Sequence, residues 1–370
     1  MASLEEIEAE LKALEARYDE AYSGKDRATV DPAGIEAMLV DLQKTAQKLS
    51  ALGALTAGDG AGALSDSIEA RKAFFERELR LVKAAREMGP SFARFSVEGT
   101  AANFVFDRYQ RHFAGQSRDT RDLGLLREMV EELKGIKKRM LAIGGKKLPP
   151  ALEQDVEIVT QNIERYSAEA VEIPRAQQTG TAEQQADRWA CLANQQFAIY
   201  QKHFAGQSRL TRRPGLLVRV IDGLKRYRAA MFDLKNKGLS STANDGNISI
   251  VDGRLSAYEK ELVEIRKVRS QAKLVDIMGA LGGNANELFE EYRNDFAGKD
   301  RTTVSLEQLG LLLDRLDELR RQMEELGRVE KNETNTNNAA VVRDYQANWV
   351  REYVAVRAAQ AGSEPATGSA

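Results

Sequence analysis

One turn occurs four times in this chain, and this repetition constrains the fold more than any other feature. A glycine marks the turn at positions 24, 115, 206 and 298, so that successive copies lie 91, 91 and 92 residues apart. Around that glycine, four further positions keep one residue type, or exchange one aromatic residue for another. They are Tyr18, Tyr109, Tyr200 and Tyr292; Tyr22, Phe113, Phe204 and Phe296; Arg27, Arg118, Arg209 and Arg301; and Thr29, Thr120, Thr211 and Thr303. Four copies in one register indicate an internal repeat.

The segment after each turn has apolar residues at alternating steps of three and four. In the second copy these residues are Leu126, Met129, Leu133, Ile136, Met140 and Ile143. The same steps begin at Ile35, Leu217 and Leu309 in the other copies. This spacing is the seam of a left-handed coiled coil. We therefore expect a helix of about 22 residues after each turn.

Two further helices complete each repeat. The segment before each turn carries aromatic residues at helical spacing, such as Phe106, Tyr109 and Phe113. After a Gly- and Asn-rich connection, a third segment repeats the 3-4 steps around one aromatic residue. This residue is Phe75, Tyr166, Tyr258 or Trp349. Ala, Leu, Glu, Arg, Lys and Gln dominate, and only seven prolines interrupt the chain, which favours helix throughout.

These patterns predict an all-α fold, a tandem array of four three-helix bundles packed like left-handed coiled coils. The predicted repeats cover residues 1–89, 90–179, 180–271 and 272–361, followed by a disordered tail at 362–370. The architecture is similar to that of spectrin-type repeats, although no sequence motif makes the chain a member of that family. Bundles placed end to end predict a rod on the order of 130 Å. Folded-back junctions predict a compact superhelix instead, and the sequence leaves both arrangements open.

The repeated turn has two interpretations. In the structural one, the glycine ends the first helix in a left-handed conformation. The arginine then bonds free carbonyls or a nearby carboxylate, and the threonine bonds the turn backbone. Asp31, Asp122 and Ser305 each stand where the second helix needs an N-cap. In the alternative, arginine and threonine at a helix N-terminus form an anion site. The candidate residues are Arg27, Thr29, Arg118, Thr120, Arg209, Thr211, Arg301 and Thr303.

Charge is balanced overall but uneven along the chain. The formal net charge is -2, which argues against a generally nucleic-acid-binding or membrane-surface protein. From Phe197 to Lys237, however, ten Lys or Arg stand against two Asp. The first 31 residues hold nine acidic and four basic residues. Together with the four arginine turns, the basic middle favours a polyanion or phosphate partner as the alternative function.

Residues for catalysis or metal binding are scarce. His112 and His203 are the only histidines, and neither has partners at the spacing of a catalytic triad or a metal site. Near a helix C-terminus, a positive imidazole interacts well with the helix dipole. Cys191, the single cysteine, is expected to be a small buried residue. We predict no catalytic residue, no cofactor and no metal.

The leading functional hypothesis is a non-enzymatic helical-repeat scaffold, spacer or assembly subunit that binds protein partners or self-associates. Regular helical repeats offer long surfaces and few catalytic clefts. The chain begins with acidic residues where a signal peptide needs a basic start, and it has no run of 18 apolar residues. A cytoplasmic protein without a membrane partner is therefore expected.

Overall fold

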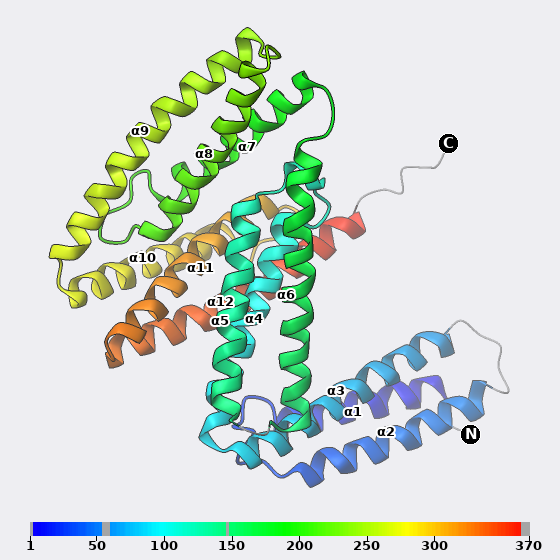
Figure 1. Cartoon of the computed structure of the whole chain (residues 1–370). Helices are drawn as coiled ribbons and strands as arrows, with labels where there is room; N and C mark the ends of the chain where they lie inside the picture. The colour runs from blue at the N-terminus through cyan, green and yellow to red at the C-terminus, as the bar shows by residue number, and fades with distance from the viewer. Residues whose placement is uncertain (1–2, 54–59, 146–147, 364–370) are drawn as a thin grey trace, which may run out of the picture. The chain divides into compact units, whose positions relative to one another are not determined.

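The computed structural model describes residues 3–53, 60–145 and 148–363, and within these ranges it contains helices and no strand (Figure 1). The α-helices are α1 (Leu4–Ala21), α2 (Pro32–Gly53), α3 (Gly60–Met88), α4 (Pro90–Phe113), α5 (Leu123–Gly144), α6 (Pro150–Gln177), α7 (Ala182–His203), α8 (Pro214–Asn236), α9 (Thr242–Gln271), α10 (Leu274–Asp295), α11 (Leu306–Val329) and α12 (Glu333–Ser363). A short 3-10 turn, η1 (Arg118–Thr120), precedes α5. The prediction of an all-α fold is confirmed.

The predicted seam is the buried side of the second helix in each copy. The helices that follow the four turns are α2, α5, α8 and α11, which have 22, 22, 23 and 24 residues. In α5, Leu126, Met129 and Leu133 are fully buried. The repeated aromatic residue of the third helix is also buried at Phe75, Tyr166, Tyr258 and Trp349. Because 3-4 spacing keeps one stripe of a helix apolar, burial of that stripe follows from the sequence.

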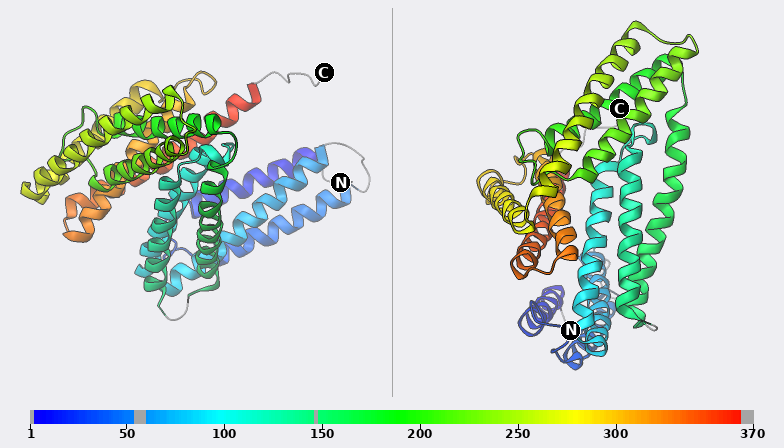
Figure 2. Two further views of the ribbon diagram at one scale, coloured as in Figure 1. Left: turned by 45° about the horizontal axis from the view of Figure 1, so that its top comes forward. Right: turned by 60° about the vertical axis from the view of Figure 1, so that its left-hand side comes forward.

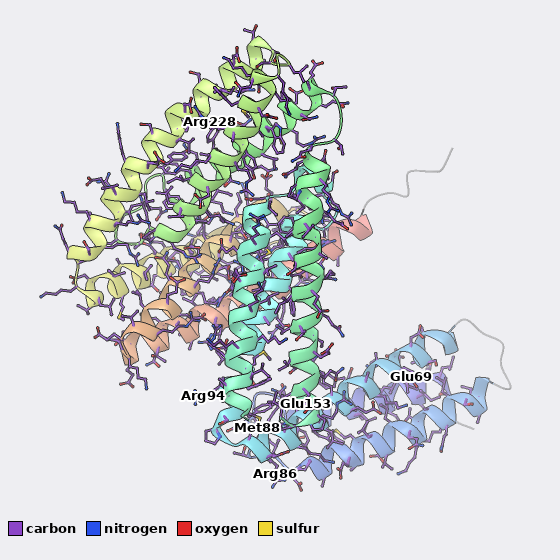
Figure 3. The ribbon with its side chains drawn as sticks, in the orientation of Figure 1. Glu69, Arg86, Met88, Arg94, Glu153 and Arg228 are labelled. Carbon is purple, nitrogen blue, oxygen red and sulfur yellow. The ribbon has the colours of Figure 1, made fainter. Side chains whose placement is uncertain are left out.

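The helix ends also follow local sequence. Gly89, with φ of 55°, separates α3 from α4, and Pro90 opens the next helix. Figure 3 shows Arg86 and Met88 at this end of α3, with Arg94 one turn into α4. Proline suits the first turn of a helix because its missing N–H has no intrahelical acceptor there. At the far end, α12 runs to Ser363, and residues 364–370 of the predicted tail lie outside the described residues.

The chain divides into two compact units. The first comprises residues 1–106 and 129–168, and the second comprises 107–128 and 169–370. Helices α4, α5 and α6 each contribute residues to both units. The units therefore do not coincide with single repeats, and each is described below by itself.

In the first unit, α1, α2 and α3 share one hydrophobic core. Ile7 and Leu11 of α1, Ile35 and Met38 of α2, and Phe75 of α3 lie in it. The three helices lie side by side in every view of Figures 1 and 2. Burying a large apolar side chain stabilises the fold by roughly 1.5–3 kcal/mol, so this shared core holds the three helices together.

The second unit contains two more groups of three helices, each with its own core. Helices α7, α8 and α9 bury Leu192, Leu224 and Tyr258 against one another. Helices α10, α11 and α12 do the same around Leu316 and Trp349. The turn before α8 also reaches the second of these cores, because its Leu210 packs against it.

Within this second unit, segments of the predicted second and fourth repeats touch. Arg108 of α4 donates to Asp317 of α11 at 3.1 Å, and Arg111 pairs with Asp314. A straight end-to-end array keeps the second and fourth repeats apart. That arrangement therefore does not describe residues 107–128 and 169–363, where the helices fold back on one another.

Candidate functional site

The four repeated turns have one backbone geometry. Their glycines have φ values of 72°, 78°, 73° and 72° at Gly24, Gly115, Gly206 and Gly298. This is the left-handed region, which glycine enters without steric cost and which ends a helix. The predicted helix end is confirmed in all four copies.

In three of the turns, the arginine donates two hydrogen bonds to one glutamate on the third helix of its own repeat. The donors are Nε and one terminal nitrogen, so each pair is bidentate. The pairs are Arg27–Glu78, Arg209–Glu261 and Arg301–Glu352, with nitrogen–oxygen distances of 2.8 to 3.0 Å. The arginine thus ties the turn to the third helix.

The second repeat uses the same elements with different partners. Arg118 pairs with Glu172 of α6 at 2.6 Å. The glutamate at the repeated position, Glu169, accepts instead from the hydroxyl of Tyr109 at 2.5 Å and from Arg121. The contact between turn and third helix is therefore kept in all four copies, although the second copy moves it by one helical turn.

The threonine of each turn bonds the backbone of that turn. Its hydroxyl donates to the carbonyl three residues earlier, at 2.8 to 3.0 Å, in Thr29, Thr120, Thr211 and Thr303. The predicted N-caps are confirmed as well. Asp31 accepts from Ala33, and Asp122 and Ser305 accept from the first-turn amides that follow them.

All eight candidate residues of the turns therefore have partners inside their own repeat. These contacts are the ones that the structural interpretation expects. They reduce the number of donors that remain for an external anion, because in three copies one edge of the guanidinium, Nε and one terminal nitrogen, already donates to a carboxylate. That the turns bind an anion stays a prediction.

The basic middle of the sequence is also paired. Nine of its ten basic residues have a carboxylate partner: Lys202, Arg209, Arg212, Arg213, Arg219, Lys225, Arg228, Lys235 and Lys237. The tenth, Arg226, lies over the ring of Tyr227. Most of the acids come from other helices, such as Glu128 of α5 and Asp314 of α11. The net positive charge counted along this segment is therefore largely neutralised in the fold.

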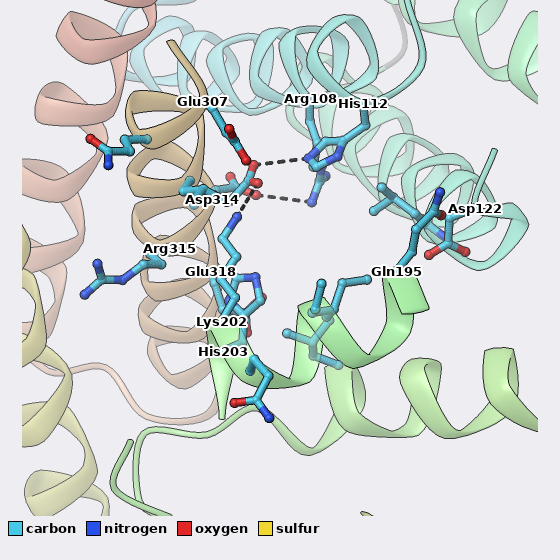
Figure 4. A pocket seen from close by; sticks show the side chains of 18 of the residues that line it. Arg108, His112, Asp122, Gln195, Lys202, His203, Glu307, Asp314, Arg315 and Glu318 are labelled. Atoms are coloured by element: carbon cyan, nitrogen blue, oxygen red, sulfur yellow. Dashed lines mark hydrogen bonds and ion pairs between the residues drawn. The ribbon is translucent and has the colours of Figure 1, made fainter. Parts of the chain in front are cut away.

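The second unit contains a pocket of about 1100 Å³, shown in Figure 4. Its lining comes from the end of α4 and the start of α5, from α7 and α8, and from α10 and α11. The apolar part of the lining consists of Phe113, Leu125, Ala198, Ile199, Leu216, Phe296 and Leu311. Ligand pockets commonly measure roughly 300–1,000 Å³, so this one is large enough for a small molecule.

Asp314 of α11 is a centre of charge in this pocket. Its carboxylate accepts from Lys202 at 2.6 Å, pairs with Arg111, and lies 3.2 Å from Nε2 of His112. Figure 4 shows Lys202 and His112 approaching it from two sides. Burial raises the pKa of this carboxyl, but the neighbouring cations outweigh burial and hold it well below its usual range. Asp314 is therefore charged at neutral pH.

Asp317, one turn further along α11, is more deeply buried. It accepts from Arg108 at 3.1 Å, from Arg320 at 2.8 Å and from Gln346 at 3.0 Å. The side chains of Arg108 and Asp317 are only 5% and 6% exposed. Burial opposes charge at Asp317, yet Arg108 and Arg320 lower its pKa. Buried ions need such complete pairing to be tolerated.

A third carboxylate, Glu128 of α5, forms ion pairs with three arginines. Arg213 lies 3.2 Å from it, Arg219 lies 3.1 Å from it, and Arg321 pairs with it as well. Burial raises the pKa of Glu128, but these arginines hold it well below its usual range. Together, Asp314, Asp317 and Glu128 join residues of the predicted second, third and fourth repeats.

Buried polar atoms with unfilled hydrogen-bonding capacity occur on the pocket lining, among them atoms of Arg219 and Glu318. Nε and Nη1 of Arg219 have no acceptor among the described residues, although Nε lies 3.1 Å from Glu128. Oε1 of Glu318 likewise has no donor within the described part of the chain. Burial raises the pKa of Glu318 despite Arg213 and Arg321 nearby. Such groups are uncommon in folded proteins and each calls for an explanation.

One of the two histidines, His203, differs from the sequence prediction. His112 contacts Asp314, as described above. Burial and the neighbouring Lys202 lower the pKa of His203 from 6.5 to about 3. The expected positive imidazole at the end of its helix is therefore wrong for His203, because desolvation and nearby cations outweigh the helix dipole.

Cys191 is exposed, so the expectation that it is a small buried residue is wrong. Its neighbours Trp189, Leu192 and Ala193 lie on the buried side of α7.

Among the described residues, no group of three or more His, Cys, Asp or Glu could hold a metal ion. In the same part of the chain, no helix has both the length and the apolar character needed to cross a membrane.

Sequence reasoning did not find the acidic residues of α11. Asp314, Asp317 and Glu318 lie in a segment that reads as a regular helix with a leucine seam. Charges at three- and four-residue spacing usually indicate a solvated helix face, and a single sequence does not distinguish a buried ion network from that pattern.

Comparison of the chain with protein-family models, curated proteins and solved structures finds no match.

Proposed function

We propose that the protein is a non-enzymatic helical-repeat scaffold, spacer or assembly subunit that binds protein partners or self-associates. Its architecture would be four three-helix bundles at residues 1–89, 90–179, 180–271 and 272–361. The shared cores of α1–α3, α7–α9 and α10–α12 support this arrangement. The bounds of α4, α5 and α6 fall within the remaining range.

The observation that carries the proposal is the internal use of the repeated residues. The turn arginine binds a carboxylate of its own repeat in every copy, and the turn threonine binds its own turn. The repeated residues hold the three helices of each repeat together, so their role is to maintain its shape. Shape and spacing are what a scaffold supplies, whereas catalysis needs reactive groups in a cleft. The proposal includes no cofactor or metal, and places the protein in the cytoplasm.

Exposure of the turn arginines favours a second candidate function, binding of a polyanion. The side chains of Arg118, Arg209 and Arg301 are 59%, 45% and 54% exposed. A polyanion could compete with the glutamates for these guanidinium groups, since exposed ion pairs contribute little to stability. For a polyanion to bind there, the ion pairs between the turn arginines and their glutamates must first break.

The scaffold proposal is tested by affinity capture from a lysate of the source, with and without nuclease, followed by sedimentation of the recovered complex. We expect a protein partner in fixed ratio, or self-association, with both the wild type and the Arg118→Ala/Arg209→Ala variant. Loss of the partner from the folded variant, or its release by nuclease, contradicts the scaffold proposal and makes the turns the binding site.

A matched pair of variants separates the two candidates more sharply. Arg209→Ala and Glu261→Gln both break the same ion pair, but only the first removes the cation. If the turns bind polyanions, Glu261→Gln should strengthen binding of heparin and Arg209→Ala should weaken it. If the pair is structural, both variants bind heparin equally weakly. Circular dichroism checks that both variants fold.

A further inference from the structure

The pocket of the second unit contains a corner where several cations lie near His203. His203 lies there among Lys202, Arg219 and Arg315, and Asp314 is the acid that acts on it. Lys202 is already bonded to Asp314, and Arg315 pairs with Glu291. Arg219 is different, because it forms an ion pair with Glu128 through Nε, while its buried Nη1 has no acceptor among the described residues. The corner therefore contains a charged side chain with one donor nitrogen left unfilled by the described residues.

Two carboxylates of the pocket are already paired with other cations. Asp314 pairs with Arg111 and Lys202 from other helices, and Asp317 pairs with Arg108 and with Arg320 of its own helix. Glu128 pairs with Nε of Arg219 at 3.1 Å but is not on the pocket lining, and it leaves Nη1 without a hydrogen bond. A buried donor without an acceptor costs free energy, and a bound oxyanion would remove that cost.

We propose that the part of the pocket lined by Arg219 and His203 binds a small organic molecule carrying one acidic group, a carboxylate or a phosphate. The acidic group would accept from Arg219, and its apolar body would lie against Leu216 and Ile199. Gln195 and Gln207 on the lining supply further polar contacts. This inference is independent of the scaffold proposal, since a scaffold and an enzyme can both hold such a ligand.

The lining also limits the ligand to one acidic group. Asp295 and Glu307 line the pocket and are exposed, and neither has an ion-pair partner within the described residues. These two acids repel a second negative group, whereas a neutral or donor-bearing body is compatible with them. A polyanion such as a nucleic acid therefore does not fit this pocket.

The chain offers a direct reporter, because it contains only two histidines. Imidazole NMR signals of the full-length protein are followed during titration with benzoate or phenyl phosphate, with His203→Gln used to assign the His203 signal. An oxyanion beside His203 should shift its signal saturably and raise its pKa from about 3 by roughly one unit or more. Benzyl alcohol and sodium chloride at matched ionic strength are the controls. A response to one probe alone identifies the acidic group.

Variants on α8 locate the site. Arg219→Gln should weaken binding of the active probe roughly tenfold or more, because it removes a charged donor. Arg228→Gln is the matched control, since Arg228 lies on the same helix but pairs with Asp252 and is absent from the pocket lining (Figure 3). If Arg219→Gln does not fold, Arg219→Lys replaces it, with a smaller loss expected.

Three results overturn the inference. The first is the absence of a saturable His203 shift with both probes in the wild type. The second is an equal response to benzyl alcohol, which would show an apolar cavity without an anion site. The third is unchanged affinity in folded Arg219→Gln or Arg219→Lys. The titration of the wild type requires no variant, so the outcome does not depend on whether a substituted protein folds.

Discussion

The repeated turns and the pocket of the second unit use the same residue types in opposite ways. At a turn, Arg301 and Glu352 form a bidentate pair whose side chains are 54% and 26% exposed. In the pocket, Arg108 and Asp317 are only 5% and 6% exposed. The turn pair occurs within one repeat and has counterparts in the others. The pocket pair joins two different repeats and has no counterpart among the described residues.

This difference separates two roles of charge in one molecule. Exposed pairs are screened by water and salt and contribute little each, so a repeat can carry them without strict requirements. Buried pairs cost desolvation and are tolerated only when every partner is present. The residues that recur in every repeat therefore make contacts inside their own repeat. The contact between repeats is made by residues, such as Arg108 and Asp317, that do not recur as a pair.

The largest effect is expected from Asp317→Ala. This change removes the carboxylate that Arg108 and Arg320 share in a buried position. Breaking a buried ion pair typically costs about 3–5 kcal/mol of unfolding free energy. Urea unfolding monitored by circular dichroism measures the loss, and Glu352→Gln at a turn serves as the control. Equal losses in the two variants would remove the distinction between turn and pocket.

A smaller, pH-dependent effect is expected from His203→Gln. The folded pKa of His203 lies near 3, below its ordinary 6.5, so the unfolded chain binds a proton more readily. Stability from the neutral imidazole is present above pH 6.5 and is lost as pH falls toward 3. Because the imidazole is half-buried, we expect His203 to account for ~2 kcal/mol of the fall in unfolding free energy at acid pH. This part of the fall should be absent from the variant.

The measurement is the unfolding free energy of wild type and variant at a series of pH values between neutral and acid. A constant difference across that series would contradict the prediction, because it would show that the pKa of His203 is the same in the folded and the unfolded chain. His112→Gln is the matched comparison, because His112 lies at the same position of its helix and contacts Asp314.

The smallest effect is expected from Glu78→Gln at the first turn. Glu78 accepts from both Arg27 and the hydroxyl of Tyr18, but the arginine is 40% exposed. An amide keeps part of this bonding, so the loss should be about 1 kcal/mol or less. Thermal unfolding in low and high salt tests it. A loss as large as that of Asp317→Ala would show that turn pairs matter as much as buried ones.

Much of the fold could be predicted because it rests on local, periodic features. The 3-4 steps of Leu126, Met129 and Leu133 identify one face of a helix, and Gly115 identifies where the preceding helix ends. The pocket could not be predicted. Asp314 and Asp317 look like residues of a solvated helix face, and only their packing against Arg108 shows otherwise.

The sequence by itself determined the helices, their buried stripes, the turn geometry and the repeat length, because each depends on residues close along the chain. Tertiary structure decided which charges are buried, which repeats touch and where a pocket forms. Those properties depend on contacts such as Arg108 with Asp317, which are 209 residues apart. Periodicity constrains each helix separately, and it contains no information about which helices of different repeats meet.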